Sequence, residues 1–167
     1  MTQLSALNES AGYARSETPP AITTPNRVPA VTVDFWLIKL MAVTMGETAA
    51  DCLAVNLGLG LTATSLLMAA VLIGALVLQF RQKRYVPWSY WLAVVLISIV
   101  GTLVTDNLVD NFGISLITTT VVFTGLLAAT FAIWFAVEGT LSIHEVKTTR
   151  REAFYWLAIL FTFALGT

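Results

Sequence analysis

Apolar residues fill five long stretches of the chain, and short polar or glycine-containing stretches separate them. The first four cover about residues 34–55, 61–80, 88–108 and 115–137, and the fifth begins at about 153 and continues to Thr167. A membrane-spanning helix needs roughly 20 mostly apolar residues, which is the length of each of the first four stretches. The pattern therefore predicts an all-α fold, a polytopic transmembrane helix bundle.

Residues 1–33 have a different pattern, rich in Ser, Thr, Pro and Ala and without apolar periodicity. Such a composition is typical of disorder, so we expect a disordered cytoplasmic tail. The segment also lacks the continuous apolar core of a signal peptide.

The apolar pattern repeats along the chain. A shift of about 55 residues places "FWLIKLMAVTMGETAADCLAVNLGLGL" on "YWLAVVLISIVGTLVTDNLVDNFGISL", and both copies contain W-L, then G, then D-x-L-x-x-N-x-G. Each unit holds two helices, so successive units enter the membrane from the same side and are parallel repeats. We predict a first repeat over 34–86 and a second over 87–150.

A third copy begins but stops early. "WLAILFTFALGT", residues 156–167, matches "WLAVVLISIVGT", residues 91–102, and ends before the expected aspartate. We therefore interpret 151–167 as the start of a truncated third repeat, and the chain as a fragment of a longer repeat protein.

Composition agrees with a membrane protein. Hydrophobic residues make up 57% of the chain and charged residues 11%, whereas soluble domains have about 25% charged residues. The net charge of −1 gives no reason to expect nucleic-acid binding. One cysteine and one histidine exclude a disulfide framework or a bis-histidine haem site within one chain, and we expect no cofactor.

Basic residues predict the orientation. Eight of the nine Lys and Arg residues lie in the tail, between the second and third helices, or between the fourth and fifth. The ninth, Lys39, lies near the same end of the first helix and can snorkel to that interface. The positive-inside rule then places the N-terminus in the cytoplasm, and we expect a multi-pass protein of the bacterial inner membrane.

Carboxylates at bilayer depth are the candidate chemistry. Glu47 and Asp51 are four residues apart on one helix face, and Asp106 is the repeat-equivalent of Asp51. Together with Asn56 and Asn111 they offer oxygen ligands for a cation or groups for a proton relay, so these five are the candidate substrate- or ion-binding residues. The identity of any metal stays open.

A structural role for the aspartates is the alternative. Asp51 and Asp106 could cap the following turn, so that D-x-L-x-x-N-x-G only shapes an outer hairpin. Glu47 does not belong to the repeated motif, because Thr102 and Thr167 stand at its position in the other copies. Glu47 is therefore the acid with the stronger claim to a function.

The remaining repeated residues have packing and anchoring roles in this interpretation. The glycine in each copy predicts close helix contacts, and the tryptophan predicts an anchor at the cytoplasmic interface. The packing residues are Gly46, Gly101 and Gly166, and the anchors are Trp36, Trp91 and Trp156.

The quoted motifs, with "TTRREAFYWLAILFTFALGT", resemble a bacterial family of tandem-repeat, uncharacterised membrane-anchored proteins, over about residues 28–167. The resemblance implies four two-helix repeats in the parent protein, each with a marked tryptophan, and it implies no activity.

We expect a transporter-like protein for a cation or small solute, or alternatively a structural or assembly protein. We do not expect an enzyme, because the chain lacks a P-loop, G-x-S-x-G, H-E-x-x-H or CxxC motif. The expected partners are the lipid bilayer, a cation or small solute, and further copies of the chain.

Overall fold

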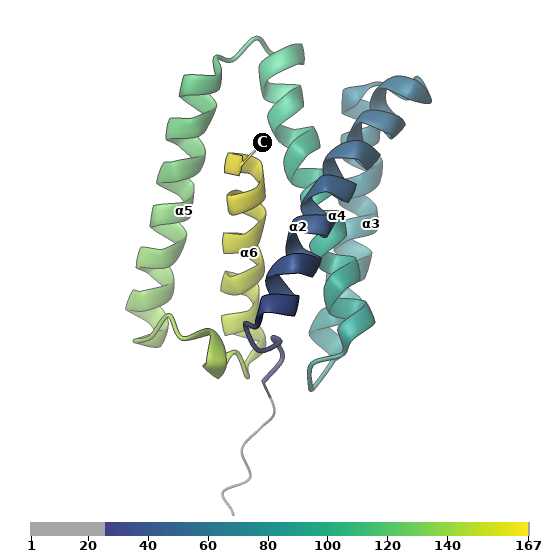
Figure 1. Ribbon diagram of the computed structural model, residues 1–167. Coiled ribbons are helices and arrows are strands. Elements are labelled where there is room, and N and C mark those ends of the chain that lie inside the picture. The colour runs from purple at the N-terminus through teal and green to yellow at the C-terminus, as the bar shows by residue number, and fades with distance from the viewer. Residues whose placement is uncertain (1–25, 167) are drawn as a thin grey trace, which may run out of the picture.

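The computed structural model describes residues 26–166, and the regular elements of this part of the chain are helices (Figure 1). The α-helices are α2 (Val33–Asp51), α3 (Leu61–Arg81), α4 (Pro87–Asp106), α5 (Leu116–Glu138) and α6 (Thr149–Gly166). Two five-residue π-helical turns, Cys52–Asn56 and Asn107–Asn111, continue α2 and α4 directly, and a short 3-10 turn, Ile143–Glu145, precedes α6. The all-α prediction is confirmed, and each helix coincides closely with one of the five apolar stretches.

Local sequence signals define the helix ends. Thr32 caps α2 by accepting a hydrogen bond from the Phe35 amide at 3.3 Å, and Ser115 caps α5 by accepting from the Thr118 amide at 3.2 Å. Pro87 begins α4, where its missing N–H costs no hydrogen bond. Gly139 ends α5 in the left-handed conformation, with φ of 69°.

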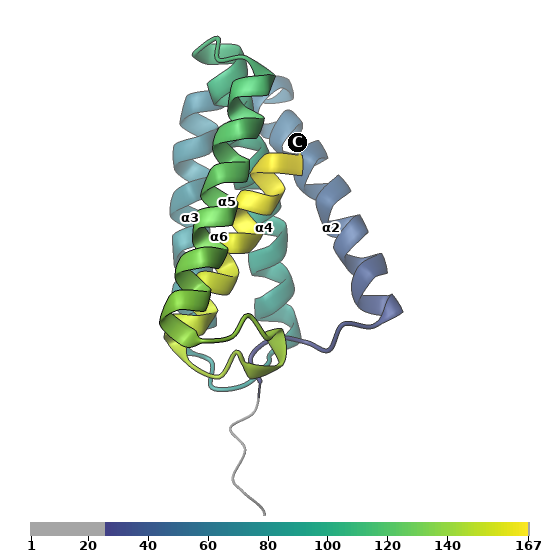
Figure 2. The same cartoon turned by 90° about the vertical axis from the view of Figure 1, so that its left-hand side faces the viewer.

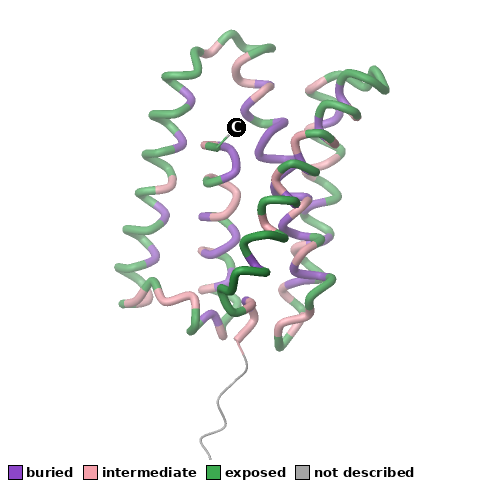
Figure 3. Tube along the Cα trace, in the orientation of Figure 1, coloured by how far each residue is buried: buried purple, intermediate pink, exposed green. Residues whose placement is uncertain are grey.

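The helices follow a repeating contact pattern. The first helices of successive units pack in series, α2 on α4 and α4 on α6. The second helix of each unit packs mainly on the first helix of the next unit, α3 on α4 and α5 on α6. α4 is consequently the central helix (Figure 3). In its most apolar segment 67% of the residues are buried, against 17% in the corresponding segments of α3 and α5.

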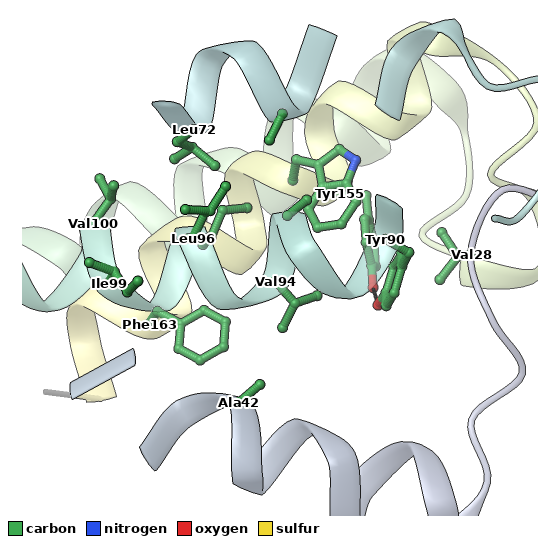
Figure 4. Packing of buried hydrophobic residues seen from close by; sticks show 14 of the residues in the cluster. Val28, Ala42, Leu72, Tyr90, Val94, Leu96, Ile99, Val100, Tyr155 and Phe163 are labelled. Atoms are coloured by element: carbon green, nitrogen blue, oxygen red, sulfur yellow. Dashed lines mark hydrogen bonds between the residues drawn. The ribbon is translucent and has the colours of Figure 1, made fainter. Parts of the chain in front are cut away.

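α4 forms the centre of the hydrophobic core and contacts the neighbouring helices on several sides. Figure 4 shows residues of α4 between side chains of three neighbouring helices. The labelled α4 residues are Val94, Leu96, Ile99 and Val100, and their neighbours include Leu72 of α3, Ala42 of α2 and Phe163 of α6. Figure 2 shows that α2 leans away from the other helices toward its N-terminal end.

Three helices are long and apolar enough to cross a membrane: α3, α4 with its π-helical turn, and α5. α2 is not among them, because it contains Asp34, Lys39, Glu47 and Asp51.

The predicted disordered tail is wrong in its last part, while residues 1–25 lie outside the described residues. Val28 is buried, and the Arg27 guanidinium forms an ion pair with Glu152 of α6. Arg27 also donates its backbone N–H to the Val146 carbonyl at 3.1 Å, and the Tyr85 amide donates to the Asn26 carbonyl at 3.2 Å. Residues 26–28 therefore join the loop before α4 to the loop before α6.

Candidate functional site

The repeated aspartates lie where two equivalent π-helical turns begin. Cys52–Asn56 follows Asp51 and Asn107–Asn111 follows Asp106, and the two turns are related by the repeat. Their backbones match: the Leu57 amide donates to the Cys52 carbonyl at 2.9 Å, and the Phe112 amide donates to the Asn107 carbonyl at 3.1 Å. π-helical turns are rare in proteins, and those that occur often lie at functional sites. The repeated motif thus encodes this turn.

Glycine completes each hairpin. Gly58 and Gly113 occupy equivalent positions, with φ of 67° and 66°, in the left-handed region that other residues rarely adopt. The capping explanation for the aspartates is wrong, because neither Asp51 nor Asp106 makes a side-chain cap hydrogen bond to its turn. Backbone hydrogen bonds and glycines shape the hairpins.

Three of the predicted acids, Glu47, Asp51 and Asp106, lie toward the same end of the bundle. Asp106 is half-buried, and Asp110 follows it in the second π-helical turn. These four carboxylates come from α2, α4 and the second π-helical turn, and lie at the end of the bundle opposite the basic loops. Asn56 is exposed on the first π-helical turn. Asn111 donates hydrogen bonds to Asn107 and Thr62.

Glu47 also lines a cavity of about 160 Å³ between α2, α4 and α6. Lys39 and Val43 form the rest of the α2 wall, and hydroxyl-bearing residues contribute from the other two helices. Those residues are Ser98 and Thr102 of α4 and Thr162 of α6, and Phe163 and Gly166 complete the lining. The cavity therefore combines a carboxylate, an ammonium group and several hydroxyls among apolar helices.

Two of the predicted packing glycines permit close helix contacts beside this cavity. A Cβ added at Gly46 would overlap the Ser98 side chain of α4. One added at Gly101 would lie 2.9 Å from Phe163 Cβ and 3.1 Å from the Ala164 nitrogen of α6. At Gly166 an added Cβ would meet nothing within 4 Å among the described residues, and Gly166 borders the cavity.

The three repeated tryptophans have different surroundings. Trp36 is 53% exposed and suits an interfacial anchor, and Trp91 is half-buried against Phe35, with ring centroids 5.6 Å apart. Trp156 is only 3% exposed and is surrounded by protein side chains. Its ring packs on Tyr90 and its Nε1 donates to Glu152 Oε1 at 3.4 Å.

Asn107 is a central polar residue that the repeat motif does not identify, because Cys52 occupies the equivalent position. Asn107 Oδ1 accepts from Thr62 Oγ1 at 3.0 Å and from Asn111 Nδ2 at 2.7 Å. Asn107 Nδ2 donates to Ser65 Oγ at 2.6 Å. This cluster ties the second π-helical turn to the start of α3, so Asn111 contributes to packing there.

A second buried polar cluster lies at the basic end of the bundle. Glu152 is 1% exposed and accepts hydrogen bonds from three residues. Arg27 NH1 donates to its Oε2 at 2.7 Å, and Gln79 Nε2 donates to its Oε1 at 3.1 Å, as does Trp156. Sequence reasoning missed this cluster, because Arg27 lies 125 residues from Glu152.

The described residues contain no group of three or more His, Cys, Asp or Glu side chains that could hold a metal ion. The site therefore consists of the mixed-charge cavity and, beyond it, the carboxylates at the π-helical turns.

Taken together, these features define an all-α protein built from tandem two-helix repeats, with helices apolar enough to cross a membrane. The chain belongs to the family described as Repeat of Unknown Function (DUF347), whose model matches residues 35–85 and 89–140. These two matches correspond to the two repeats predicted from the sequence. No curated protein and no solved structure matches the chain.

Proposed function

We propose that the protein is transporter-like and moves a cation or small solute through a membrane by means of intramembrane carboxylates. The observation that carries the proposal is the cavity at the junction of α2, α4 and α6, where Glu47 lies among hydroxyl-bearing residues. Ionisable side chains inside a membrane protein normally face such a cavity or a partner and mark a transport pathway.

The acids near the π-helical turns support the same proposal. Asp51, Asp106 and Asp110 lie beyond Glu47, toward the end of the bundle that carries no basic loop. Carboxylates at the mouth of a pathway attract cationic groups and raise their local concentration. The C-terminal ends of α2 and α4 add the negative end of their helix dipoles there.

The arrangement of the basic loops supports an N-terminus in the cytoplasm of a bacterial inner membrane. The hydrogen bonds of Asn26 and Arg27 to Tyr85 and Val146 bring the segments rich in Lys and Arg to one end of the bundle (Figure 1). Transport through the cavity would then connect the carboxylate end, outside, with the basic end, inside.

Flux measurements on the full chain in lipid vesicles test the proposal. Proton entry is followed with a trapped pH-sensitive dye, Mn²⁺ entry by quenching of a trapped fluorophore, and small-solute entry by osmotic swelling. We expect at least one flux above that of empty vesicles, abolished by Glu47→Gln together with Asp51→Asn. Asp34→Asn, an exposed acid in the first turn of the same helix, is the matched control. Fluxes equal to empty vesicles would overturn the proposal.

The alternative is a structural or assembly protein, and the hydrogen-bonded Asn107 cluster favours it. There the acids only position the helices, so Glu47→Gln would lower the unfolding temperature while all fluxes stay at background.

A further inference from the structure

The cavity that contains Glu47 also contains a positive charge. Lys39 lies eight residues before Glu47 on α2, and both side chains line the same cavity. At about 1.5 Å per residue their Cα atoms are about 12 Å apart along the helix axis. One wall of the cavity therefore carries an ammonium group toward the basic end of the bundle and a carboxylate toward the other end.

Neither charge is neutralised within residues 26–166. The ion pairs of this part of the chain join Arg27, Arg150 and Arg151 to other acids, so Lys39 and Glu47 have no oppositely charged partner within 4 Å there. The Lys39 ammonium instead lies 5.5 Å from the Trp36 ring centroid and 5.9 Å from that of Phe163. Charges inside a membrane protein normally pair with an opposite charge. Because Lys39 and Glu47 have no such partner in the described part of the chain, both can pair with a ligand.

From this geometry we infer that the ligand of the cavity is a small zwitterion, a molecule of the amino-acid class with one amine and one carboxylate. Its carboxylate pairs with Lys39 and its ammonium pairs with Glu47, which balances both charges of the cavity. A bare cation would bind Glu47 but would be repelled by Lys39 in the same low-dielectric space. The inference rests on the proposed function and names its substrate class.

The hydroxyls that line the cavity suit this ligand. Ser98 Oγ donates to the Val43 carbonyl at 3.4 Å, and Thr162 Oγ1 donates to the Ala158 carbonyl at 2.7 Å. Their protons are used on the backbone, so their oxygens offer lone pairs to an N–H donor. An ammonium group near Glu47 can use these acceptors.

The volume limits the size of the ligand. A protein cavity of about 150 Å³ holds benzene, so the cavity of about 160 Å³ accommodates about six non-hydrogen atoms. β-Alanine has this size, and its two charges lie at opposite ends. It is therefore the probe for the test.

The test measures β-alanine binding to the full chain in lipid nanodiscs by titration calorimetry. Methylamine, with only the positive charge, and acetate, with only the negative charge, are measured in parallel. We expect β-alanine to bind about tenfold or more tightly than either analogue. Lys39→Gln and Glu47→Gln should each weaken β-alanine binding by about tenfold or more, while Lys39→Arg should retain it.

A charge exchange separates ligand binding from folding. Lys39→Glu combined with Glu47→Lys keeps one charge of each sign in the cavity, so it should bind β-alanine better than either single neutral variant. Lys83→Gln, in the exposed loop before α4, is the control and should bind like the original chain. Circular dichroism confirms that each variant is folded.

Two outcomes would overturn the inference: methylamine or Mn²⁺ binding as tightly as β-alanine, or Lys39→Gln leaving β-alanine binding unchanged. Cation flux that depends on Glu47, without β-alanine binding, would overturn the inference and leave the proposed transport intact. Binding of β-alanine without any flux would support the zwitterion site and overturn the proposed transport.

Discussion

Arg27, ahead of the first described helix, forms an ion pair of 2.7 Å with Glu152 of α6, whose side chain is 1% exposed. The pair connects the beginning of the described chain with α6, across both repeats. Glu152 also accepts hydrogen bonds from Gln79 and Trp156, so three residues donate to its carboxylate.

Arg27→Gln is expected to destabilise the fold. Removing one partner of a buried ion pair leaves an uncompensated charge and typically costs about 3 kcal/mol or more. Thermal unfolding in detergent should show the loss, and Arg27→Gln combined with Glu152→Gln should recover part of it. The matched control is Arg150→Gln, since the Arg150 side chain is 67% exposed and Glu138 keeps Arg151 as a partner at 2.6 Å. A loss in the control as large as in Arg27→Gln would contradict the special role of the buried pair.

Gly46→Ala is expected to lower the free energy of unfolding by about 2 kcal/mol, because the new Cβ overlaps the Ser98 side chain and forces α2 away from α4. Adding Ser98→Gly removes the overlapping atoms and should restore part of the loss. Gly74→Ala in α3 is the control: an added Cβ there meets nothing within 4 Å, and alanine favours the helix. Equal unfolding temperatures for Gly46→Ala and Gly74→Ala would contradict the close contact.

Asn107→Ala is expected to destabilise the hairpin between α4 and α5 by about 2 kcal/mol, because Thr62, Ser65 and Asn111 each lose a hydrogen-bond partner. The repeat supplies its own control in Cys52, the equivalent residue of the first π-helical turn, which is exposed. Cys52→Ala should change the unfolding temperature little. If the two substitutions have the same effect, the polar cluster does not stabilise the fold.

The sequence was sufficient for the helices, because clear signals bound the apolar stretches: the repeated Asp-to-Gly motif follows the first and third, and Pro87 begins the third. The π-helical turns could not be predicted, since five residues without a periodic side-chain pattern do not distinguish α from π geometry. The repeat did identify their positions, through Asp51 and Asp106.

The candidate site could be predicted only in part, because its cavity is formed by helices that are far apart in the sequence. Glu47 stands out in the sequence because it breaks the repeat, whereas the position of Lys39 indicates only a residue that snorkels to the interface. Both line the same cavity together with residues of α4 and α6, and these helices follow α2 only after the loops and helices between them. Trp36 and Trp156 differ for a related reason: repeat-equivalent residues have different neighbours at the edge and in the interior of the bundle.

Labelling of Cys52 can determine the orientation of the chain. Cys52 is the only cysteine, is exposed, and begins the π-helical turn at the end opposite the basic loops. A membrane-impermeant maleimide added to intact bacterial spheroplasts expressing the chain should therefore label Cys52, because the positive-inside rule places this end outside. The matched variant carries Cys52→Ser with Lys83→Cys, which moves the single thiol to the basic loop, and it should react only after the membrane is permeabilised. Labelling of the Lys83→Cys variant in intact spheroplasts, with protection of Cys52, would reverse the proposed orientation and would place the carboxylates of the π-helical turns in the cytoplasm.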